Sequence, residues 1–377
     1  MSRKGHSRSE MKRNNEKRSS RRTMLKSAGG LAIAGIGGPM ATRVRASPTE
    51  DVEITYSYSH KDVHNPEKGI NEETKEVPKE WYSELTHARQ VRSKKNFEKK
   101  PGVQSVSVLP GKYGGQSAKI RVGASEKTAE EADKHVDDIL GSIPDWSEGV
   151  EIEKEEVGIG KSVTCYDSDY GNSVPGGAKV ETGDGSAYGT LSGAVYYIGY
   201  GPRFATNYHI FNEYDDVAGK KMHHPESTNE AIGEIDIAGC GKDIVVAESI
   251  NNHTASDEIA GTSLSVVGQY TKDGVDDLIA ADKSATKNGV KSCETSGKVV
   301  ASDGYIGYVD DGCGDRNYQV KGEWTTNPGD SGSAAYRDVG GGEAKVLSMN
   351  AGTDPLNGNT YGFGAYHLDD YFSIYWA

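Results

Sequence analysis

Residue types that together perform nucleophilic catalysis occur in this chain at two well-defined segments. Ser331 is the central residue of 329–333, whose sequence is Gly-Asp-Ser-Gly-Ser. Glycines on both sides of a serine allow a tight turn that presents its hydroxyl to a substrate. His209 ends the segment Thr-Asn-Tyr-His at 206–209, after the apolar run Ala194–Tyr200. Because an imidazole titrates near neutral pH, it can take the hydroxyl proton and return it to a leaving group. The two segments predict acyl transfer through a serine nucleophile.

A third residue, a carboxylate that orients the imidazole, is expected between these two segments, and several aspartates compete for the role. Asp243 directly precedes the apolar run Ile244–Ala247, so a strand beginning there could bury the carboxylate beside the imidazole. Asp236 is a rival, but glycines interrupt the apolar run that follows it. Asp276 and Asp277 are further candidates and come later than expected. We therefore predict Asp243 as the acid.

These segments resemble the trypsin-like serine peptidases of the chymotrypsin fold over roughly residues 175–377, and the overall pattern resembles exported members from halophilic archaea. The resemblance implies an oxyanion hole formed by the N–H groups of Gly329 and Ser331. It places Thr325, six positions before the nucleophile, at the base of the primary specificity pocket, where a threonine does not support a preference for Arg or Lys. Ser348 and Asn350 would line the substrate cleft, on a strand that pairs with the bound peptide.

The part of the chain that must position these residues has the sequence pattern of an all-β domain. From Cys165 onward, short apolar stretches alternate with Gly, Asn, Asp and Ser clusters, and the whole chain contains 48 glycines. The resemblance implies a double antiparallel β-barrel over 165–377, including a strand pair within Lys287–Gly297. We also expect a closing helix over His367–Tyr375.

Upstream of this domain the sequence predicts two further segments. Residues 47–100 are interpreted as a charged linker with a short alternating run at Val52–Tyr56 and a helix over Pro78–Lys99. Residues 101–160 predict a small α/β module in the order strand, strand, helix, strand, with the strands at 103–109, 118–122 and 150–157. This module is either a propeptide or an independent accessory domain.

The first 46 residues have the features of an export signal. The sequence Ser-Arg-Arg-Thr-Met-Leu-Lys at 20–26 resembles the twin-arginine signal and precedes a Gly- and Ala-rich run, Ala28–Ala41, which is too short to span a bilayer. Val44-Arg45-Ala46 is a small-residue cleavage site, with Ser47 as the first residue of the exported protein. We expect the twin-arginine machinery to deliver an extracellular protein without a membrane anchor.

Charge and cysteine content narrow the function classes. Residues 1–46 contain 12 Lys and Arg and two acidic residues, which gives this leader a net charge of +10. The whole chain has a net charge of −13, so the remainder has a net charge of −23. Such an acidic body argues against nucleic acid as a partner, and it suits either a protein working in high salt or one whose charge serves solubility alone. Four cysteines allow three pairings, of which we favour Cys293 with Cys313 because both flank an expected hairpin. The sequence contains no C-x-x-C pair, and the adjacent His223 and His224 point to opposite faces of a strand, so no metal or other cofactor is predicted.

Rival catalytic folds fit the sequence less well. An α/β-hydrolase needs the order Ser, Asp, His, but only 46 residues follow Ser331. The segment 261–265 superficially resembles the nucleophile segment of subtilisin-like enzymes, but the helical continuation that such enzymes need is absent. A non-catalytic peptide-binding module of the peptidase fold is the remaining alternative. We predict a secreted, monomeric serine endopeptidase that acts on protein or peptide substrates.

Overall fold

A computed structural model describes residues 50–62, 68–97, 103–114, 117–124, 151–153, 165–166, 168–197, 200–212, 216–224, 230–307, 314–354 and 358–376. The signal segment 1–46 and the helix expected near 128–140 lie outside these ranges. Residues Thr49–Ala377 form one compact unit. Within the described ranges, no helix combines the length and apolar character needed to cross a bilayer.

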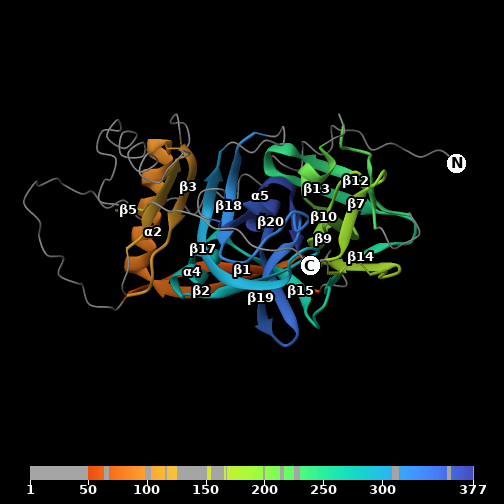
Figure 1. Ribbon diagram of the computed structural model, residues 1–377. Helices are drawn as coiled ribbons and strands as arrows, with labels where there is room; N and C mark the ends of the chain where they lie inside the picture. Colours follow the sequence, from red (N-terminus) through yellow and green to blue (C-terminus); the bar gives the residue numbers. More distant parts are fainter. Residues whose placement is uncertain are drawn as a thin grey trace, which may run out of the picture. The chain divides into compact units, whose positions relative to one another are not determined.

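One sheet of the protein contains eight antiparallel strands and carries the His209 segment. Its spatial order is β22 (Ile374–Trp376), β9 (Gly193–Tyr197), β10 (Pro202–Thr206), β13 (Ile244–Ser249), β12 (Ala231–Gly239), β11 (Lys221–His223), β7 (Lys179–Thr182) and β8 (Tyr188–Thr190). The apolar residues of β9, β10 and β13 are buried, because these central strands are covered on both faces. In Figure 1 most of these strands, drawn in green tones, lie at the right.

The second sheet contains a closed antiparallel barrel that carries the Ser331 segment. Six strands pair in a ring: β16 (Ser284–Gly289), β17 (Cys293–Ile306), β18 (Arg316–Gly322), β21 (Thr360–Gly364), β20 (Glu343–Thr353) and β19 (Ala334–Gly340), which pairs again with β16. On its outside, β15 (Ser265–Tyr270) pairs in parallel with β20 and links to β14 (Thr254–Ile259) and β6 (Ser173–Gly176). The two sheets, which are mostly antiparallel, confirm the predicted all-β class, and the expected strand pair within 287–297 is present as β16 and β17.

Two helices differ from the sequence prediction. Helix α4 (Lys272–Ala280) was not expected; the hydroxyl of Thr271 caps it by accepting a hydrogen bond from the Gly274 N–H at 3.0 Å. The closing helix is present but shorter than predicted, as α5 (Tyr366–Phe372). The residues after it form β22, which pairs with β9 of the first sheet instead of continuing the helix.

Residues predicted to be a charged linker instead form ordered elements. The chain makes an antiparallel hairpin of β1 (Asp51–His60) and β2 (Ile70–Pro78), followed by α2 (Lys79–Lys95), the expected helix. Strand β1 pairs with β15, so the hairpin extends the second sheet. The prediction failed because β2 is an exposed edge strand whose many charged residues are typical of an edge that faces water.

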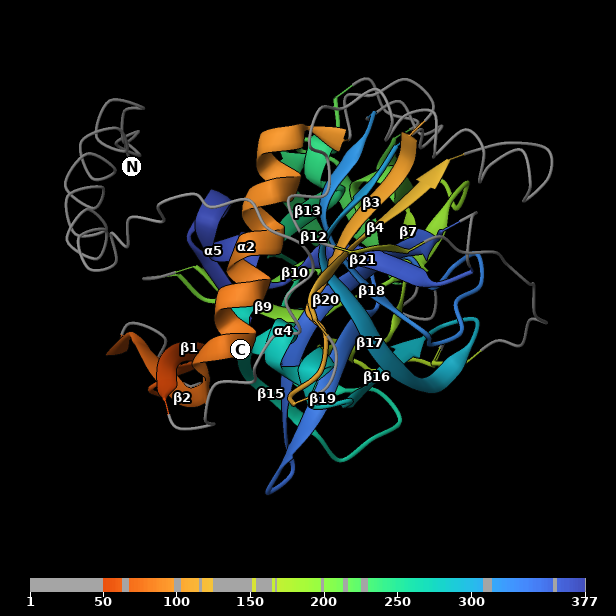
Figure 2. The ribbon, with the colours of Figure 1, turned by 90° about the vertical axis from the view of Figure 1, so that its left-hand side faces the viewer.

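The small upstream module is also joined to the second sheet. Strands β3 (Val103–Leu109), β4 (Lys119–Ala124) and β5 (Glu151–Glu153) are all present where strands were expected, and β3 pairs with β17. Helix α2 packs against β3 at the left of Figure 1 and in front in Figure 2. Its buried residues Trp81, Leu85 and Ala88 repeat at helical spacing and share a core with Tyr305 of β17.

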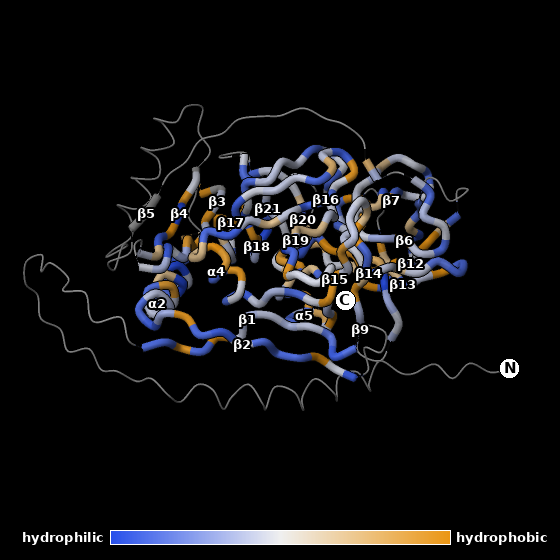
Figure 3. Tube along the Cα trace, turned by 90° about the horizontal axis from the view of Figure 1, so that it is seen from below, coloured by the Kyte–Doolittle hydropathy of each residue, from blue (hydrophilic) through white to orange (hydrophobic). Residues whose placement is uncertain are grey.

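Ion pairs reinforce the contact between this upstream region and the barrel. Arg89 of α2 pairs with Asp273 at 2.8 Å and also with the fully buried Asp276 of α4. Lys75 of β2 pairs with Asp277 at 2.6 Å. Figure 3 shows hydrophobic colour on α4, β3 and β4, whereas β2 is largely hydrophilic. The upstream elements are therefore attached to the second sheet by strand pairing, by a shared apolar core and by ion pairs with buried aspartates.

The disulfide prediction was wrong. Cys165 is bonded to Cys293, with the two Cα atoms 5.3 Å apart, and the N–H of Cys165 donates to the carbonyl of Val290 at 2.6 Å. Cys293 begins β17, whereas β18 pairs with the opposite end of that long strand, from Val299 to Ile306. Cys240 is also disulfide-bonded, and Cys313 lies outside the described residues.

Candidate active site

The structure brings the imidazole of His209 and the carboxylate of Asp243 into direct contact. His209 Nδ1 lies 2.8 Å and 3.0 Å from the two carboxylate oxygens, and the backbone N–H of His209 donates to Oδ1 at 2.9 Å. The Asp243 side chain is 2% exposed, whereas that of His209 is 25% exposed. Because the carboxylate binds Nδ1, the other ring nitrogen, Nε2, remains the atom that can exchange a proton.

Two neighbouring strands position this pair. Strand β10 pairs with β13, with Thr206 opposite Val245, so the residues after β10 and before β13 meet at one edge. His209 then lies on a short 3-10 helix, η4 (Tyr208–Phe211), and Asp243 follows a second one, η5 (Cys240–Lys242). The buried Asn207 side chain donates to the Asp243 carbonyl at 2.9 Å and ties the two turns together.

The charge state of Asp243 follows from its surroundings. Burial alone would raise the pKa of this carboxyl. The charges of His209 and Arg316 and the hydrogen bonds from His209 outweigh burial and lower the pKa below its usual range. Asp243 is therefore an anion at neutral pH, as an acid that orients an imidazole must be.

The Ser331 loop packs against the strand that leads to His209. The N–H of Thr190 on β8 donates to the Ser331 carbonyl at 2.7 Å, and the Thr190 carbonyl accepts from the Thr206 hydroxyl at 2.7 Å. Gly332 has φ +92°, and a Cβ there would lie 2.1 Å from both the Thr190 carbonyl and the Thr206 hydroxyl. Only glycine fits this close approach. The segments of Ser331 and His209 thus meet against one common strand.

The hydrogen bonding of the same loop bears on the predicted oxyanion hole. Gly329 has φ +105°, which favours glycine, and its carbonyl accepts from the Thr190 hydroxyl at 2.8 Å. The N–H groups of Asp330, Gly332 and Ser333 all donate to carbonyls of the protein. Within the described part of the chain, none of the backbone hydrogen bonds found in this loop uses the N–H of Gly329 or Ser331. These two are the donors expected to face a substrate carbonyl.

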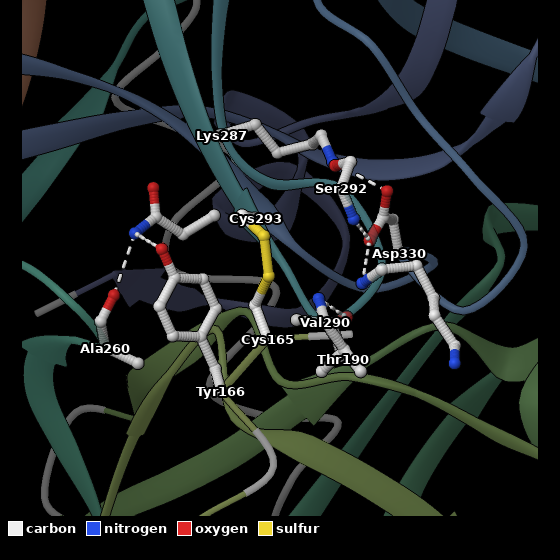
Figure 4. Close-up of a disulfide and its surroundings, with 11 residues drawn as sticks. Cys165, Tyr166, Thr190, Ala260, Lys287, Val290, Ser292, Cys293 and Asp330 are labelled. Carbon is white, nitrogen blue, oxygen red and sulfur yellow. Dashed lines mark hydrogen bonds and ion pairs between the residues drawn. A yellow bond between two sulfur atoms is a disulfide. The ribbon is translucent and has the colours of Figure 1, made fainter. Parts of the chain in front are cut away.

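A buried ion pair supports the loop of the predicted nucleophile, 329–333, from inside. The Asp330 carboxylate accepts from Lys287 Nζ at 3.0 Å, and neither side chain is exposed. It also accepts from the N–H groups of Asn327, Lys291 and Ser292, at 2.9, 2.7 and 3.0 Å. Burial would raise the Asp330 pKa, but the charge of Lys287, the Ser292 side chain and the N–H groups of Asn327 and Lys291 lower it. Figure 4 shows Lys287, Ser292 and Asp330 grouped beside the Cys165–Cys293 disulfide.

The residues expected to bind substrate occupy different environments. Asn350 is 1% exposed; its side-chain amide donates to the Asp330 carbonyl at 3.1 Å and its oxygen accepts from the Thr326 hydroxyl at 3.1 Å. Ser348 is fully buried on β20. Thr325 is exposed. Its neighbour Thr326 is the threonine whose hydroxyl contacts Asn350. Asn350 and the nucleophile loop therefore form one hydrogen-bonded unit.

The rival acids have other partners. Asp236 pairs with Arg203, while Asp276 and Asp277 hold the upstream elements, as described above. Both ring nitrogens of His224 lie 2.8 Å from backbone carbonyls, those of Lys179 and Ser168. Among the described residues, no group of three His, Cys, Asp or Glu side chains is arranged to hold a metal ion.

Two functional neighbours of the site were not predicted from sequence: Lys287 beside Asp330, and Arg316 beside Asp243. Lys287 falls within the strand pair predicted at 287–297, and the residues before it on β16 alternate in burial, with Ala285 buried and Ser284 exposed. A charged residue on the inward face of a strand is the signal that could have revealed it. Arg316 follows a stretch outside the described residues, and its sequence gives no comparable signal.

Comparisons with known proteins give a limited result. No protein-family profile matches this sequence, and a search of curated proteins finds no match. Solved structures similar to the chain include a glutamic acid-specific serine protease, with 15% identity, a TM-score of 0.41, and coverage of 54% of this chain and 100% of that one. Protease A of Thermobifida fusca is similar with 17% identity and a TM-score of 0.41, and the match covers 54% of this chain and 97% of that one. A chymotrypsin of Cellulomonas bogoriensis is similar with 16% identity and a TM-score of 0.41, and the match covers 54% of this chain and 98% of that one.

Proposed function

We propose that this protein is a secreted serine endopeptidase that hydrolyses peptide bonds through His209, Asp243 and Ser331. The observation that carries the proposal is the contact of the buried, ionised Asp243 carboxylate with His209 Nδ1 at 2.8 Å. A structural histidine rarely needs a buried anion on one nitrogen together with a partly exposed ring. That combination is what a general base requires, since the carboxylate fixes the tautomer and stabilises the imidazolium.

In the proposed reaction, His209 Nε2 removes the hydroxyl proton of Ser331 while Oγ attacks the scissile carbonyl carbon. The oxyanion that forms accepts hydrogen bonds from the N–H groups of Gly329 and Ser331. His209 then gives its proton to the leaving amine as the C–N bond breaks, which leaves an acyl-enzyme on Ser331. Water, activated by His209 in the same way, hydrolyses the ester and restores the serine.

Labelling with a fluorophosphonate tests this proposal directly. The wild-type protein is expected to be modified at Ser331 and to digest casein, and Ser331→Ala is expected to be unlabelled and slower by roughly 10⁴–10⁶. Thr326→Ser, which keeps the hydroxyl that contacts Asn350, is a matched control that should retain labelling. If Ser331→Ala digests casein as fast as wild type does, the assignment is wrong. If wild type neither reacts nor digests casein, a non-catalytic peptide-binding module becomes the better function.

Export and maturation form a second part of the proposal. We expect the twin-arginine machinery to deliver a monomeric extracellular enzyme, without a membrane anchor, that acts on proteins or peptides and not on nucleic acid. N-terminal sequencing of the secreted form tests the processing. A start near Ser47 would make the upstream elements a permanent part of the enzyme, whereas a start near 165 would make them a propeptide. Retention of residues 1–46 would contradict a cleaved signal.

A further inference from the structure

The Asp243 carboxylate has a second charged neighbour besides His209. Arg316 begins β18, in the second sheet, and its side chain is fully buried. Arg316 Nη2 lies 3.5 Å from Asp243 Oδ1, and Nη1 donates to the Cys240 carbonyl at 2.6 Å. A guanidinium from one sheet therefore reaches the turn, η5, that holds the acid of the other sheet. Because it also bonds the backbone of that turn, its position is fixed.

A nearby lysine has a different role. The ammonium of Lys242, the residue before Asp243, lies 4.0 Å from the ring centre of Tyr318 and 3.9 Å from that of Tyr371. The two aromatic faces hold this cation by cation–π interactions. In the described structure, the ion pairs of the Asp243 carboxylate are those with His209 and Arg316. Lys242 is therefore a neighbouring cation that can serve as a comparison for Arg316.

The other charged groups on the elements around η4 and η5 have partners of their own. These are Lys179 with Glu181 on β7, Lys321 with Asp354, Asp315 with the Tyr305 hydroxyl, Asp370 with His367, Asp369 with the Tyr375 hydroxyl, and Arg203 with Asp236. Glu248 is near the far end of β13, opposite Arg203 of β10, whereas Asp243 directly precedes the start of that strand. Arg316 is thus the cation that the fold adds to the His209–Asp243 pair.

We propose that Arg316 is a positioning residue of the triad, which keeps Asp243 ionised and makes His209 less ready to hold a proton. An anion beside the imidazole favours the imidazolium, and a fixed cation on the far side of that anion opposes this effect. The general base then stays unprotonated at lower pH than it would with a neutral residue at 316. This inference rests on the proposed function, because it assigns a role within that same triad.

The test follows the titration of His209 by NMR with ¹⁵N-labelled histidine, in a Ser331→Ala background. The His209 signal is identified by its loss in a His209→Gln variant. Arg316→Met is expected to move the titration midpoint to higher pH, and Arg316→Lys, which keeps a cation, should move it less. Lys242→Met, which removes the neighbouring cation, should leave the midpoint close to that of the background protein. An unchanged midpoint in folded Arg316→Met overturns the proposal.

Two further measurements make the outcome decisive. In the Ser331-containing protein, Arg316→Met should shift the acid limb of the kcat/KM profile to higher pH and lower kcat by about tenfold, as expected for a loosened catalytic geometry. If Arg316→Met does not fold, the double variant Asp243→Asn, Arg316→Met, which removes both charges, should fold; its failure to fold would contradict the pairing. If wild type shows no peptidase activity but the NMR midpoint moves, the proposed function fails and the coupling of Arg316 to His209 stands.

Discussion

Lys287 and Asp330 illustrate how single residues hold the loop that carries Ser331 in place. Asp330 is next to the nucleophile in sequence, yet its carboxylate is buried against Lys287 and three backbone N–H groups. Burial lowers the pKa of Lys287, and the charge of Asp330 counteracts this effect. Each charge is tolerated in the interior only because the other is present.

We predict that Lys287→Met damages the nucleophile loop. The variant leaves the Asp330 carboxylate buried without its cation, which costs about 3–5 kcal/mol in unfolding free energy when a buried pair is broken. We also expect a large loss of fluorophosphonate labelling, because the backbone that presents Ser331 relaxes. Denaturant unfolding and labelling rates measure the two effects.

A second buried pair provides the control for this variant. Lys321 and Asp354 are also both about 1% exposed and lie 2.7 Å apart, without a contact to 329–333 among the hydrogen bonds described. Lys321→Met should lose comparable stability, while the folded fraction still labels at a rate near that of wild type. Equal loss of labelling in both variants would contradict a specific role for Lys287.

At this scale, the sequence allowed prediction of residues whose local pattern is distinctive. Ser331 stands between glycines, and the contact of His209 with Asp243 was expected from an aspartate at the start of an apolar strand. Lys287 and Arg316 were missed because isolated cations in a sequence are usually solvated. Their burial depends on partners far along the chain, which no short pattern encodes.

At the scale of elements, attachment of the upstream region is the main difference from expectation. Individual strands and α2 could be predicted from period-two and helical spacing, but their pairing with β15 and β17 could not, because strand pairing depends on contacts between distant segments. The charged character of β2 favoured a linker, because residues 71–76 of this edge strand are all exposed. The Arg89 and Lys75 ion pairs with α4 further bind these elements to the barrel.

Leu85→Ala tests whether the upstream elements and the barrel unfold together. Leu85 is fully buried in α2, in a core that includes Tyr305 of β17, so the cavity should cost about 2–5 kcal/mol. We expect the single unfolding transition of the whole protein, followed by fluorescence in denaturant, to move to lower denaturant. Glu80→Ala, at an exposed position of the same helix, should change stability by less than about 1 kcal/mol. Two transitions, of which Leu85→Ala moves only one, would instead indicate separate folding units.

For the whole molecule, buried aspartates set the response to acid. Burial would raise the pKa values of Asp243, Asp303 and Asp330, but their ion pairs and hydrogen bonds outweigh it and lower all three. An aspartate in the unfolded chain has a pKa of about 3.9. At pH values around and below this pKa, the folded protein therefore binds fewer protons at these three residues than the unfolded chain does. Their contribution to stability is fully present above that pH and is lost as pH falls through the lower, folded-state values.

We expect the urea midpoint to be nearly constant between about pH 7 and pH 5 and to fall steeply below about pH 4. Asp303→Asn is expected to have lower stability at neutral pH, because Lys272 and Arg92 lose their partner, but a shallower fall in acid. Urea unfolding at several pH values measures both. A midpoint that rises between pH 5 and pH 3 would show that the sign is wrong.

The two strand pairings of the upstream region have a consequence for the fate of a cut chain. β1 joins β15, and β3 joins β17 at a separate place on the same sheet. If the backbone were severed between residues 153 and 165, so that β5 stays with β4 on the N-terminal fragment, release of that fragment would require both attachments to open at once. Whenever one opens alone, the other keeps the loose strand at high effective concentration beside its old neighbour, so it rebinds before it can diffuse away. A nicked protein would therefore remain together during purification as two chains, and cleavage of the backbone and release of the N-terminal fragment would be separate events.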